Sequence, residues 1–307
     1  MLLKRISAFL ELMRPLEWSK TFGNIILGVI AAAFYFQPNF SFELISKILL
    51  ACISAGICLW SGLYVLNDYT DWKKDLEHEV KRKRPIPSGR VKPNEALIFS
   101  IALIILAFVI GSFLSTLFLL CLLAMLINQL LYTTKPIKLK EKPIADLISG
   151  SLINPIFRFS CGWVLIANNF NIPLLFLLFI LGLQFGGFTL YRLSSKSLEK
   201  KLAYNSSVVL LSPKFLKTIS YFAIFISLLS YVLLCFADIY KPLQYFGYLP
   251  FCYLYYGLLM LLPLPLYKNA LLNPEKINIK RMYFVLYIHY ILFILGLILL
   301  MFVFKIR

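Results

Sequence analysis

Nine apolar stretches, most of them long enough to cross a lipid bilayer, restrict what this chain can fold into. They cover residues 21–36, 44–66, 96–113, 115–132, 144–166, 173–191, 216–236, 244–266 and 282–304. A bilayer core of about 30 Å needs a helix of roughly 20 apolar residues. Apolar residues make up 60% of the chain and charged residues only 15%, against about 25% charged in soluble domains. The sequence therefore predicts an all-α, polytopic integral membrane protein with nine transmembrane helices.

The basic residues are distributed by membrane side. If the N-terminus faces the cytoplasm, 26 of the 31 lysines and arginines fall in inward-facing connections, and Lys47, Lys241, Lys305 and Arg307 lie outside. Cytoplasmic loops of membrane proteins carry such an excess of positive charge. We therefore expect the N-terminus in the cytoplasm and the C-terminus outside. The net charge of +17 reflects this topology, so no nucleic-acid partner is expected.

The polar chemistry is concentrated on the inner side. Residues 1–20 alternate apolar and charged positions, which predicts an interfacial N-terminal helix. Two long inner loops, 67–95 and 192–215, are separated by four spans, as a duplicated four-helix unit would give. The six cysteines stand singly in apolar runs, so we expect no disulfide framework and no zinc or haem site. We interpret residues 1–307 as one transmembrane domain whose active site faces the cytoplasm.

The most informative run begins where the second span ends. At about 100° per residue, Asn67, Asp68, Asp71 and Asp75 fall within about a 100° arc of one helix face. Three carboxylates and an amide oxygen so placed repel one another unless a hard cation lies between them, and Mg²⁺ prefers such oxygen ligands. We predict a Mg²⁺ site with these four ligands and expect the three aspartates to be catalytic. The alternative is a solvated acidic helix end.

A basic run follows directly, and two prolines end it. Its four cations, at positions 81–84, suit a diphosphate, whose charge needs both a metal and cationic donors. We select Arg82 and Arg84 as substrate-binding candidates because of the flanking prolines. Electrostatic anchoring to anionic lipid is the alternative for both. It is our interpretation of the other basic residues nearby, Lys73, Lys74, Arg90 and Lys92.

These residues resemble a known family. The run NDxxDxxxD at 67–75, followed by KRKRPIPSG, is similar to the first aspartate-rich motif of the UbiA superfamily of intramembrane prenyltransferases. Arg14 and Pro15, with Trp18 and Lys20, resemble the segment before that family's first span. Tyr132 through Lys138 resembles its tyrosine-led basic turn, so Tyr132 and Lys138 become substrate-binding candidates by resemblance.

The resemblance implies a nine-helix, UbiA-like bundle that opens to the cytoplasm. It also implies transfer of a polyprenyl group from a polyprenyl diphosphate to an acceptor, with Mg²⁺ holding the diphosphate. Ionisation of the allylic carbon–oxygen bond needs metal stabilisation of the leaving group and aromatic faces near the cation. The partners implied are this lipid, the bilayer and a small acceptor of unspecified identity.

The second motif departs from the family pattern. Where the family has two aspartates, this chain has Ser195 and Glu199. We expect Arg192, Lys196, Lys200 and Lys201 to supply the positive charge of a second metal. Arg192, Lys196 and Glu199 are the substrate-binding candidates of this motif. The basic character also resembles the superfamily branch that transfers phosphoribose from phosphoribosyl diphosphate to a polyprenyl phosphate, which is one alternative function. A non-enzymatic lipid- or partner-binding relative is another.

Two charged residues fall in the fifth apolar stretch. Arg158 lies about fourteen residues into it, where an arginine costs at least a few kcal/mol and faces the bundle interior. Its expected partner is a helix carbonyl, an amide of Asn154 or Asn128, or a group of the substrate. We interpret Asp146 as a helix-starting residue beside Lys142. A transporter is not favoured, because apart from Arg158 the spans carry no charged midplane site.

Overall fold

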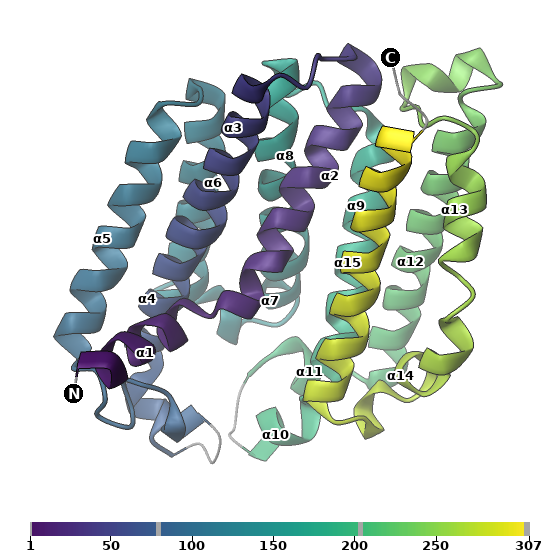
Figure 1. The fold of residues 1–307 in the computed structure, drawn as a ribbon. Helices are drawn as coiled ribbons and strands as arrows, with labels where there is room; N and C mark the ends of the chain where they lie inside the picture. Colours follow the sequence, from purple (N-terminus) through teal and green to yellow (C-terminus); the bar gives the residue numbers. More distant parts are fainter. Residues whose placement is uncertain (1, 78–80, 202–204, 304–307) are drawn as a thin grey trace.

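The structure, a computed structural model, describes residues 2–77, 81–201 and 205–303, and its regular elements there are all helical (Figure 1). The α-helices are α1 Leu2–Met13, α2 Trp18–Phe36, α3 Phe42–Ala51, α4 Ser61–Asp75, α5 Pro93–Ser112, α6 Thr116–Thr133, α7 Ala145–Ile148, α8 Asn154–Ala167, α9 Leu174–Leu193, α10 Lys196–Lys201, α11 Ser207–Leu210, α12 Pro213–Phe236, α13 Tyr253–Leu259, α14 Lys268–Leu272 and α15 Ile279–Val303. Single turns of 3₁₀ helix are η1 Pro15–Glu17, η3 Lys81–Lys83, η4 Leu139–Glu141, η6 Lys241–Tyr245, η7 Leu264–Tyr267 and η8 Pro274–Lys276, and η2 Cys52–Trp60 and η5 Ser149–Ile153 are π-helical. The predicted all-α class is confirmed.

Eight helical stretches in the described part of the chain are long and apolar enough to cross a membrane. They are Leu3–Phe36, Phe42–Asp75, Pro93–Ser112, Thr116–Thr133, Ala145–Ala167, Leu174–Leu193, Pro213–Phe236 and Arg281–Val303. They agree with eight of the nine predicted spans, and the helices stand side by side as one bundle (Figure 1). The chain is an integral membrane protein.

The remaining predicted span, residues 244–266, crosses the bundle without forming one continuous helix. Figure 1 shows this light-green segment descending beside α12, with α13 in its middle. The cause lies in the sequence, because Pro250, Pro263 and Pro265 lack the backbone N–H that a helix interior needs. Gly247 also has a positive φ of 144°, a backbone conformation that residues other than glycine rarely adopt.

The N-terminal segment is a helix, a turn and then the first span. The predicted interfacial helix ends at Met13, and Arg14 takes a left-handed conformation (φ 52°) before η1. Leu3, Ile6 and Leu10 are exposed on α1, as expected for a helix that lies in the bilayer interface. The turn brings Arg14 and Glu17 against α4, where they contact Asp68 and Tyr64.

Two close contacts fix the neighbours of α2. A Cβ added to Gly28 would collide with the carbonyl of Phe159, and one added to Gly162 would collide with the carbonyl of Ile25. Small residues at such contacts let membrane helices pack backbone to backbone. Therefore α2 and α8 are held tightly together, which places Arg158 of α8 in the bundle interior.

Both predicted motif loops lie at the same end of the bundle. In Figure 1 the end of α4, the end of α9 and the short helices α10 and α11 are all at the lower end, whereas α15 finishes at the upper end. The predicted loops 67–95 and 192–215 include residues 78–80 and 202–204, which lie outside the described residues. The predicted C-terminal end at 304–307 also lies outside them.

Candidate active site

The first aspartate-rich run lies on the last two turns of α4. Asp68 is 3% exposed and Asp75 only 1%, although both are charged groups at a helix end. Asn67 and Asp71 lie four residues apart on the same helix. All four residues lie on α4, as the helical periodicity requires, and their convergence on one metal stays a prediction.

Lysine and arginine side chains join these four residues into two pairs. Arg84 Nη1 lies 2.9 Å from Asp68 Oδ1 and 3.1 Å from Asp75 Oδ2. Lys140 Nζ lies 3.0 Å from Asn67 Oδ1 and 2.6 Å from Asp71 Oδ2. The four candidate metal ligands are therefore arranged as two pairs, each bridged by one cationic side chain.

Two further cations complete what we call the aspartate cluster, defined as Asp68, Asp71 and Asp75 with Arg14, Lys81, Arg84 and Lys140. Arg14 Nη2 lies 2.5 Å from Asp68 Oδ1, and Lys81 Nζ lies 3.6 Å from Asp75 Oδ1. The cations come from three different segments and remain partly exposed, with 26% of the Arg14 side chain and 28% of Arg84 accessible. Four positive charges face three negative ones.

The donor set fits Mg²⁺ chemically, because carboxylate and amide oxygens are its usual protein ligands. Asp75 Oδ1 is buried without a hydrogen-bond partner, and its only described ion pair is with Lys81 at 3.6 Å. No group of three or more Asp, Glu, His or Cys side chains among the described residues is gathered closely enough to hold a metal. The expected single set of four ligands is therefore not preformed, because Arg84 and Lys140 stand between its members.

The two arginine candidates of the basic run differ in whether they contact the aspartates. Arg84 contacts the cluster, whereas Arg82 is exposed and forms no ion pair with the motif aspartates in the described contacts. Arg90 binds Glu11 of α1 through two hydrogen bonds of 2.6 and 3.0 Å. The structure therefore brings only the second of the two predicted arginines to the aspartates.

The lysines in the turn after α6 also have different partners. Lys138 Nζ binds Glu141 Oε1 at 2.6 Å, and Lys74 binds the same oxygen at 2.8 Å. Although burial opposes ionisation of Glu141, these two lysines lower the pKa of Glu141 to about 2. The residue that reaches the aspartates is Lys140, which the sequence analysis missed. Its signal was present in the alternating lysines at 138, 140 and 142.

Tyr132 lies between the two predicted motifs. It is half-buried near the end of α6, within electrostatic range of Asp71 on one side and of Arg192, Asp146 and Glu199 on the other. The structure thus places this candidate where both halves of the proposed site meet.

The second motif forms an internal ion pair. Arg192 donates from Nε and Nη2 to the two oxygens of Glu199, at 3.2 and 3.0 Å. Ser195 and Ser206 donate to the same carboxylate. Burial opposes ionisation of Glu199, but Arg192 and these hydroxyls together lower its pKa. Glu199 is fully hydrogen-bonded by protein groups.

Asp146 belongs to this second group and not to Lys142. It is completely buried, accepts hydrogen bonds from the Ser207 backbone N–H (3.1 Å) and hydroxyl, and lies 3.4 Å from Arg192 Nη2. Its interpretation as a helix-starting residue beside Lys142 is therefore incomplete, since its side chain ties α7 to α9 and α11. We call Asp146, Arg192, Glu199 and Ser207 the second cluster.

Lys196 does not join the second cluster. Its Nζ donates to the carbonyl of Leu211 at 3.0 Å. This hydrogen bond joins α10 to the residues just before α12. Burial and the neighbouring Lys200 lower the pKa of Lys196.

Arg158 has none of its expected protein partners. It is 6% exposed, and its guanidinium lies over the ring of Trp60 at 3.8 Å from the ring centre. The amides expected to bind it pair with each other instead, since Asn128 Nδ2 donates to Asn154 Oδ1 at 2.7 Å. The Nε atom of Arg158 has no hydrogen-bond partner.

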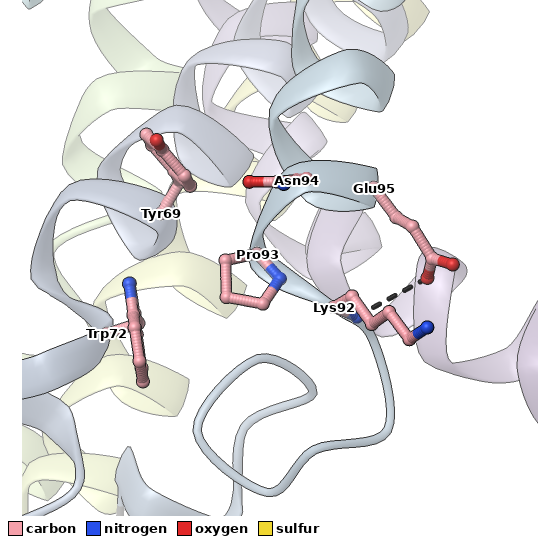
Figure 2. A pocket seen from close by; sticks show the side chains of 6 residues that line it. All are labelled: Tyr69, Trp72, Lys92, Pro93, Asn94 and Glu95. Carbon is pink, nitrogen blue, oxygen red and sulfur yellow. Dashed lines mark hydrogen bonds between the residues drawn. The ribbon is translucent and has the colours of Figure 1, made fainter.

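A surface hollow of about 510 Å³ lies beside the aspartate cluster, not within it. Figure 2 shows its walls, with Tyr69 and Trp72 from α4 and residues 92–95 at the start of α5. None of the motif aspartates lines it. Tyrosine, tryptophan and lysine are typical of the membrane interface, which accounts for this composition.

Fold and site together define an integral membrane protein of helices with a carboxylate and cation cluster at one end of the bundle. The sequence profile of the UbiA prenyltransferase family matches residues 24–289. The chain therefore belongs to the UbiA prenyltransferase family.

Individual relatives agree with this assignment. A digeranylgeranylglyceryl phosphate synthase of Methanocaldococcus jannaschii is 28% identical over 232 residues, 75% of each chain. One of Methanococcus maripaludis is 33% identical over 164 residues, 53% of this chain, and the matched stretch spans about half (54%) of that relative's length. The fold is similar to that of a UbiA homologue from Archaeoglobus fulgidus bound to GPP and Mg²⁺, with a TM-score of 0.69, 19% identity and coverage of 95% and 98% of the two chains.

Proposed function

We propose that this chain transfers a polyprenyl group from a polyprenyl diphosphate to an acceptor, with Mg²⁺ as cofactor. The observation that carries the proposal is the aspartate cluster, in which buried carboxylates and excess cations meet at one end of a membrane bundle. A diphosphate needs both kinds of group, because its charge is dispersed by a metal and by cationic hydrogen-bond donors.

Substrate binding would exchange partners within the cluster. The diphosphate oxygens would take hydrogen bonds from Arg14, Lys81, Arg84 and Lys140, which releases the carboxylates they now bridge. Asn67, Asp68, Asp71 and Asp75 would then hold Mg²⁺. The metal supplies Lewis-acid stabilisation of the leaving diphosphate.

The chemical step breaks the allylic carbon–oxygen bond, and its electron pair leaves with the diphosphate. The allylic carbon then bonds to the acceptor nucleophile, whose proton passes to the released diphosphate. Tyr132 lies within electrostatic range of both clusters, and the Tyr64 ring centre lies 5.0 Å from Arg14 of the aspartate cluster. Aromatic faces stabilise a nearby cation electrostatically.

The contacts of the second cluster favour a single metal site, at the aspartate cluster, and no metal at the second motif. Both of its carboxylates are already bound by Arg192, serine hydroxyls and a backbone N–H. The same pairing neutralises Arg192, so it offers less cationic character than phosphoribosyl diphosphate binding would need. Prenyl transfer is therefore preferred over phosphoribosyl transfer. The roles of Arg192 and Lys196 as substrate contacts remain predictions, and we propose a structural role for Glu199, whose carboxylate is bound by Arg192, Ser195 and Ser206.

The membrane orientation is part of the proposal, with the N-terminus and the aspartate cluster cytoplasmic and the C-terminus outside. Its support is the 26 basic residues on the inner connections. Single cysteines introduced at positions 197 and 169 should be labelled only from the cytoplasmic and the outer side, respectively. The reverse labelling would overturn the orientation.

Turnover in proteoliposomes tests the function itself. Purified protein is supplied with radiolabelled prenyl diphosphates of several lengths and a lipid extract as the source of acceptor. We expect Mg²⁺-dependent diphosphate release and a labelled lipid product, both lost in Asp71→Ala. Asp238→Ala is the matched control, since Asp238 is an exposed carboxylate beyond the other end of α12. Product from Asp71→Ala at the wild-type rate would refute the proposal.

A further inference from the structure

The hollow of Figure 2 is separate from the aspartate cluster and plays no part in the proposed reaction. Four of its wall residues carry hydrogen-bond donors, namely the hydroxyl of Tyr69, the indole N–H of Trp72, the ammonium of Lys92 and the amide of Asn94. In the part of the chain that the structure describes, none of these four side chains donates a hydrogen bond to another protein group. The volume of about 510 Å³ is within the range of roughly 300–1,000 Å³ that is usual for small-molecule sites. The hollow can therefore hold a group that accepts several hydrogen bonds.

The charge around the hollow is positive. Glu95, the carboxylate in its wall, is already bound by Arg5 at 2.7 Å and by the backbone N–H of Lys92 at 3.3 Å. Within the described residues, the ammonium of Lys92 has no carboxylate at salt-bridge distance. The same holds for Lys73, whose Nζ lies 5.8 Å from the ring centre of Trp72. Two unmatched cations thus stand beside a neutralised carboxylate, so the hollow favours an anionic group over a neutral one.

The aromatic walls of the hollow are held from behind. Tyr69 and Trp72 lie one helical turn apart on α4, and both pack against an apolar cluster that α1, α4, the loop before α5 and α5 build together. Its buried members are Ala8, Leu12, Val65, Ile86, Val91 and Ala96. A side chain that is already fixed by packing loses little conformational freedom when a ligand binds. The two aromatic donors are therefore preorganised.

The interfacial helix α1 places the hollow at the level of the lipid headgroups. Leu3, Ile6 and Leu10 are exposed on α1, as in helices that lie in the plane of the membrane surface. From this helix Arg5 reaches Glu95 at the wall of the hollow. Because α1 and the hollow are joined directly, both lie where the phosphates of the bilayer are.

An exposed apolar stripe runs from the hollow along α5. At about 100° per residue, Asn94, Ile98, Ile101 and Ile105 fall within about a 60° arc of the helix. All three isoleucines are exposed. A free phosphate ion would gain nothing from this stripe, whereas the acyl chains of a lipid would cover it while the headgroup occupies the hollow. The stripe therefore favours a phospholipid over a free anion.

We propose that the hollow binds the phosphate headgroup of an anionic membrane phospholipid. Lys92 and Lys73 supply the positive charge. Tyr69, Trp72 and Asn94 donate hydrogen bonds to the phosphate oxygens, and the acyl chains lie along the stripe on α5. This lipid belongs to the surrounding bilayer and is not a substrate, so the inference does not depend on the proposed prenyl transfer.

Photocrosslinking locates the lipid without requiring turnover. Protein in phosphatidylcholine nanodiscs receives a small fraction of phosphatidylglycerol with a diazirine in its acyl chain. A parallel sample receives diacylglycerol with the same chains, which lacks the phosphate. Mass spectrometry compares the labelling of residues 94–105 with that of residues 215–225, the corresponding exposed stretch of α12. We expect phosphatidylglycerol to label residues 94–105 roughly tenfold more and diacylglycerol to label both stretches equally, and equal labelling by phosphatidylglycerol would overturn the proposal.

Lys92→Gln assigns the effect to the hollow, with Lys214→Gln as its matched control. Both residues are exposed lysines next to a proline at the start of a membrane helix, α5 and α12 respectively. A lysine near the membrane surface contributes about fivefold to the binding of an anionic lipid. Lys92→Gln should therefore lower the labelling of residues 94–105 by phosphatidylglycerol about fivefold, whereas Lys214→Gln should not change it. Unchanged labelling in Lys92→Gln, or the same loss in Lys214→Gln, would show that only the general surface charge attracts the lipid.

Trp72→Phe tests the hydrogen-bonding wall, because it removes the indole N–H and keeps an aromatic ring. It should lower the labelling of residues 94–105, and unchanged labelling would contradict the role of Trp72. Excess inorganic phosphate, compared with sodium chloride at the same ionic strength, separates a lipid site from a site for the free ion. We expect labelling to be the same in both salts. Its loss in inorganic phosphate alone would overturn the assignment to a phospholipid.

Discussion

The two clusters at the lower end of the bundle use the same residue types in opposite ways. In the aspartate cluster, three carboxylates face four cations, of which Arg14, Lys81 and Arg84 are 26–28% exposed and Lys140 is 13% exposed. In the second cluster, one arginine with 13% of its side chain exposed is shared by two carboxylates, and hydroxyls and a backbone N–H satisfy the remaining oxygens.

The difference separates exchangeable ion pairs from structural ones. Arg14, Lys81 and Arg84 keep contact with water, so they can leave their carboxylates when a diphosphate offers them a stronger charge-assisted partner. A buried pair that loses one member leaves an unpaired charge, which costs about 3–5 kcal/mol. We conclude that the aspartate cluster is suited to binding substrate and metal, whereas the second cluster ties α7, α9 and α11 together.

The largest effect is expected for Arg84→Ala. Arg84 bridges Asp68 and Asp75 and is proposed to bind diphosphate, so its loss should lower kcat/KM for the prenyl diphosphate at least a hundredfold, about 2.7 kcal/mol. Arg90→Ala is the control, because Arg90 is in the same loop but pairs with Glu11 on the surface. A threefold or smaller effect of Arg84→Ala would show that its pairing with the aspartates is only structural.

A change of stability, not of rate, is expected for Glu199→Ala. Removing this carboxylate leaves Arg192 with Asp146 alone at 3.4 Å, which should lower the free energy of unfolding by about 3 kcal/mol. Thermal unfolding in detergent measures the loss, and activity per folded molecule should stay within threefold of wild type. A tenfold loss of activity with an unchanged Tm would instead make Glu199 a substrate contact.

The smallest effect is expected from Glu141, at the edge of the aspartate cluster. Its pKa is about 2 in the folded protein and ordinarily 4.5. A carboxyl with a lowered pKa stabilises the fold above its ordinary pKa, and this contribution disappears as the pH falls toward the folded value. The difference in Tm between wild type and Glu141→Gln should therefore shrink between pH 5 and pH 3. A difference that does not change over this range would mean that Lys74 and Lys138 do not stabilise the ionised form.

Much of the fold follows from local sequence properties. Spans are set by the length of apolar runs, and the shared face of Asp68, Asp71 and Asp75 follows from helical rotation. The break within residues 244–266 was missed because apolar length was weighed above the prolines at 250, 263 and 265. Those prolines matter more than hydropathy for the continuity of a helix.

The ion pairs of the candidate site cannot be predicted from local sequence in the same way, because they join distant segments. Arg14 and Asp68 are 54 positions apart, and Lys140 and Asp71 are 69 apart. No local periodicity specifies which cation of a basic loop meets which carboxylate. For the same reason no sequence pattern distinguishes Arg84 from Arg82, or Lys140 from Lys138, as the partner of the aspartates. The stack of Arg158 on Trp60 depends on two π-helical segments, which leave no pattern in residue type.

The most direct test of the aspartate cluster as a metal and diphosphate site is the affinity for a prenyl diphosphate with and without Mg²⁺. Isothermal titration is carried out on wild-type protein in excess Mg²⁺ and again in excess chelator. We predict that binding weakens at least tenfold in chelator, because the carboxylates then return to Arg84 and Lys140 and repel the diphosphate. Equally tight binding in chelator would contradict a metal site at Asp68, Asp71 and Asp75.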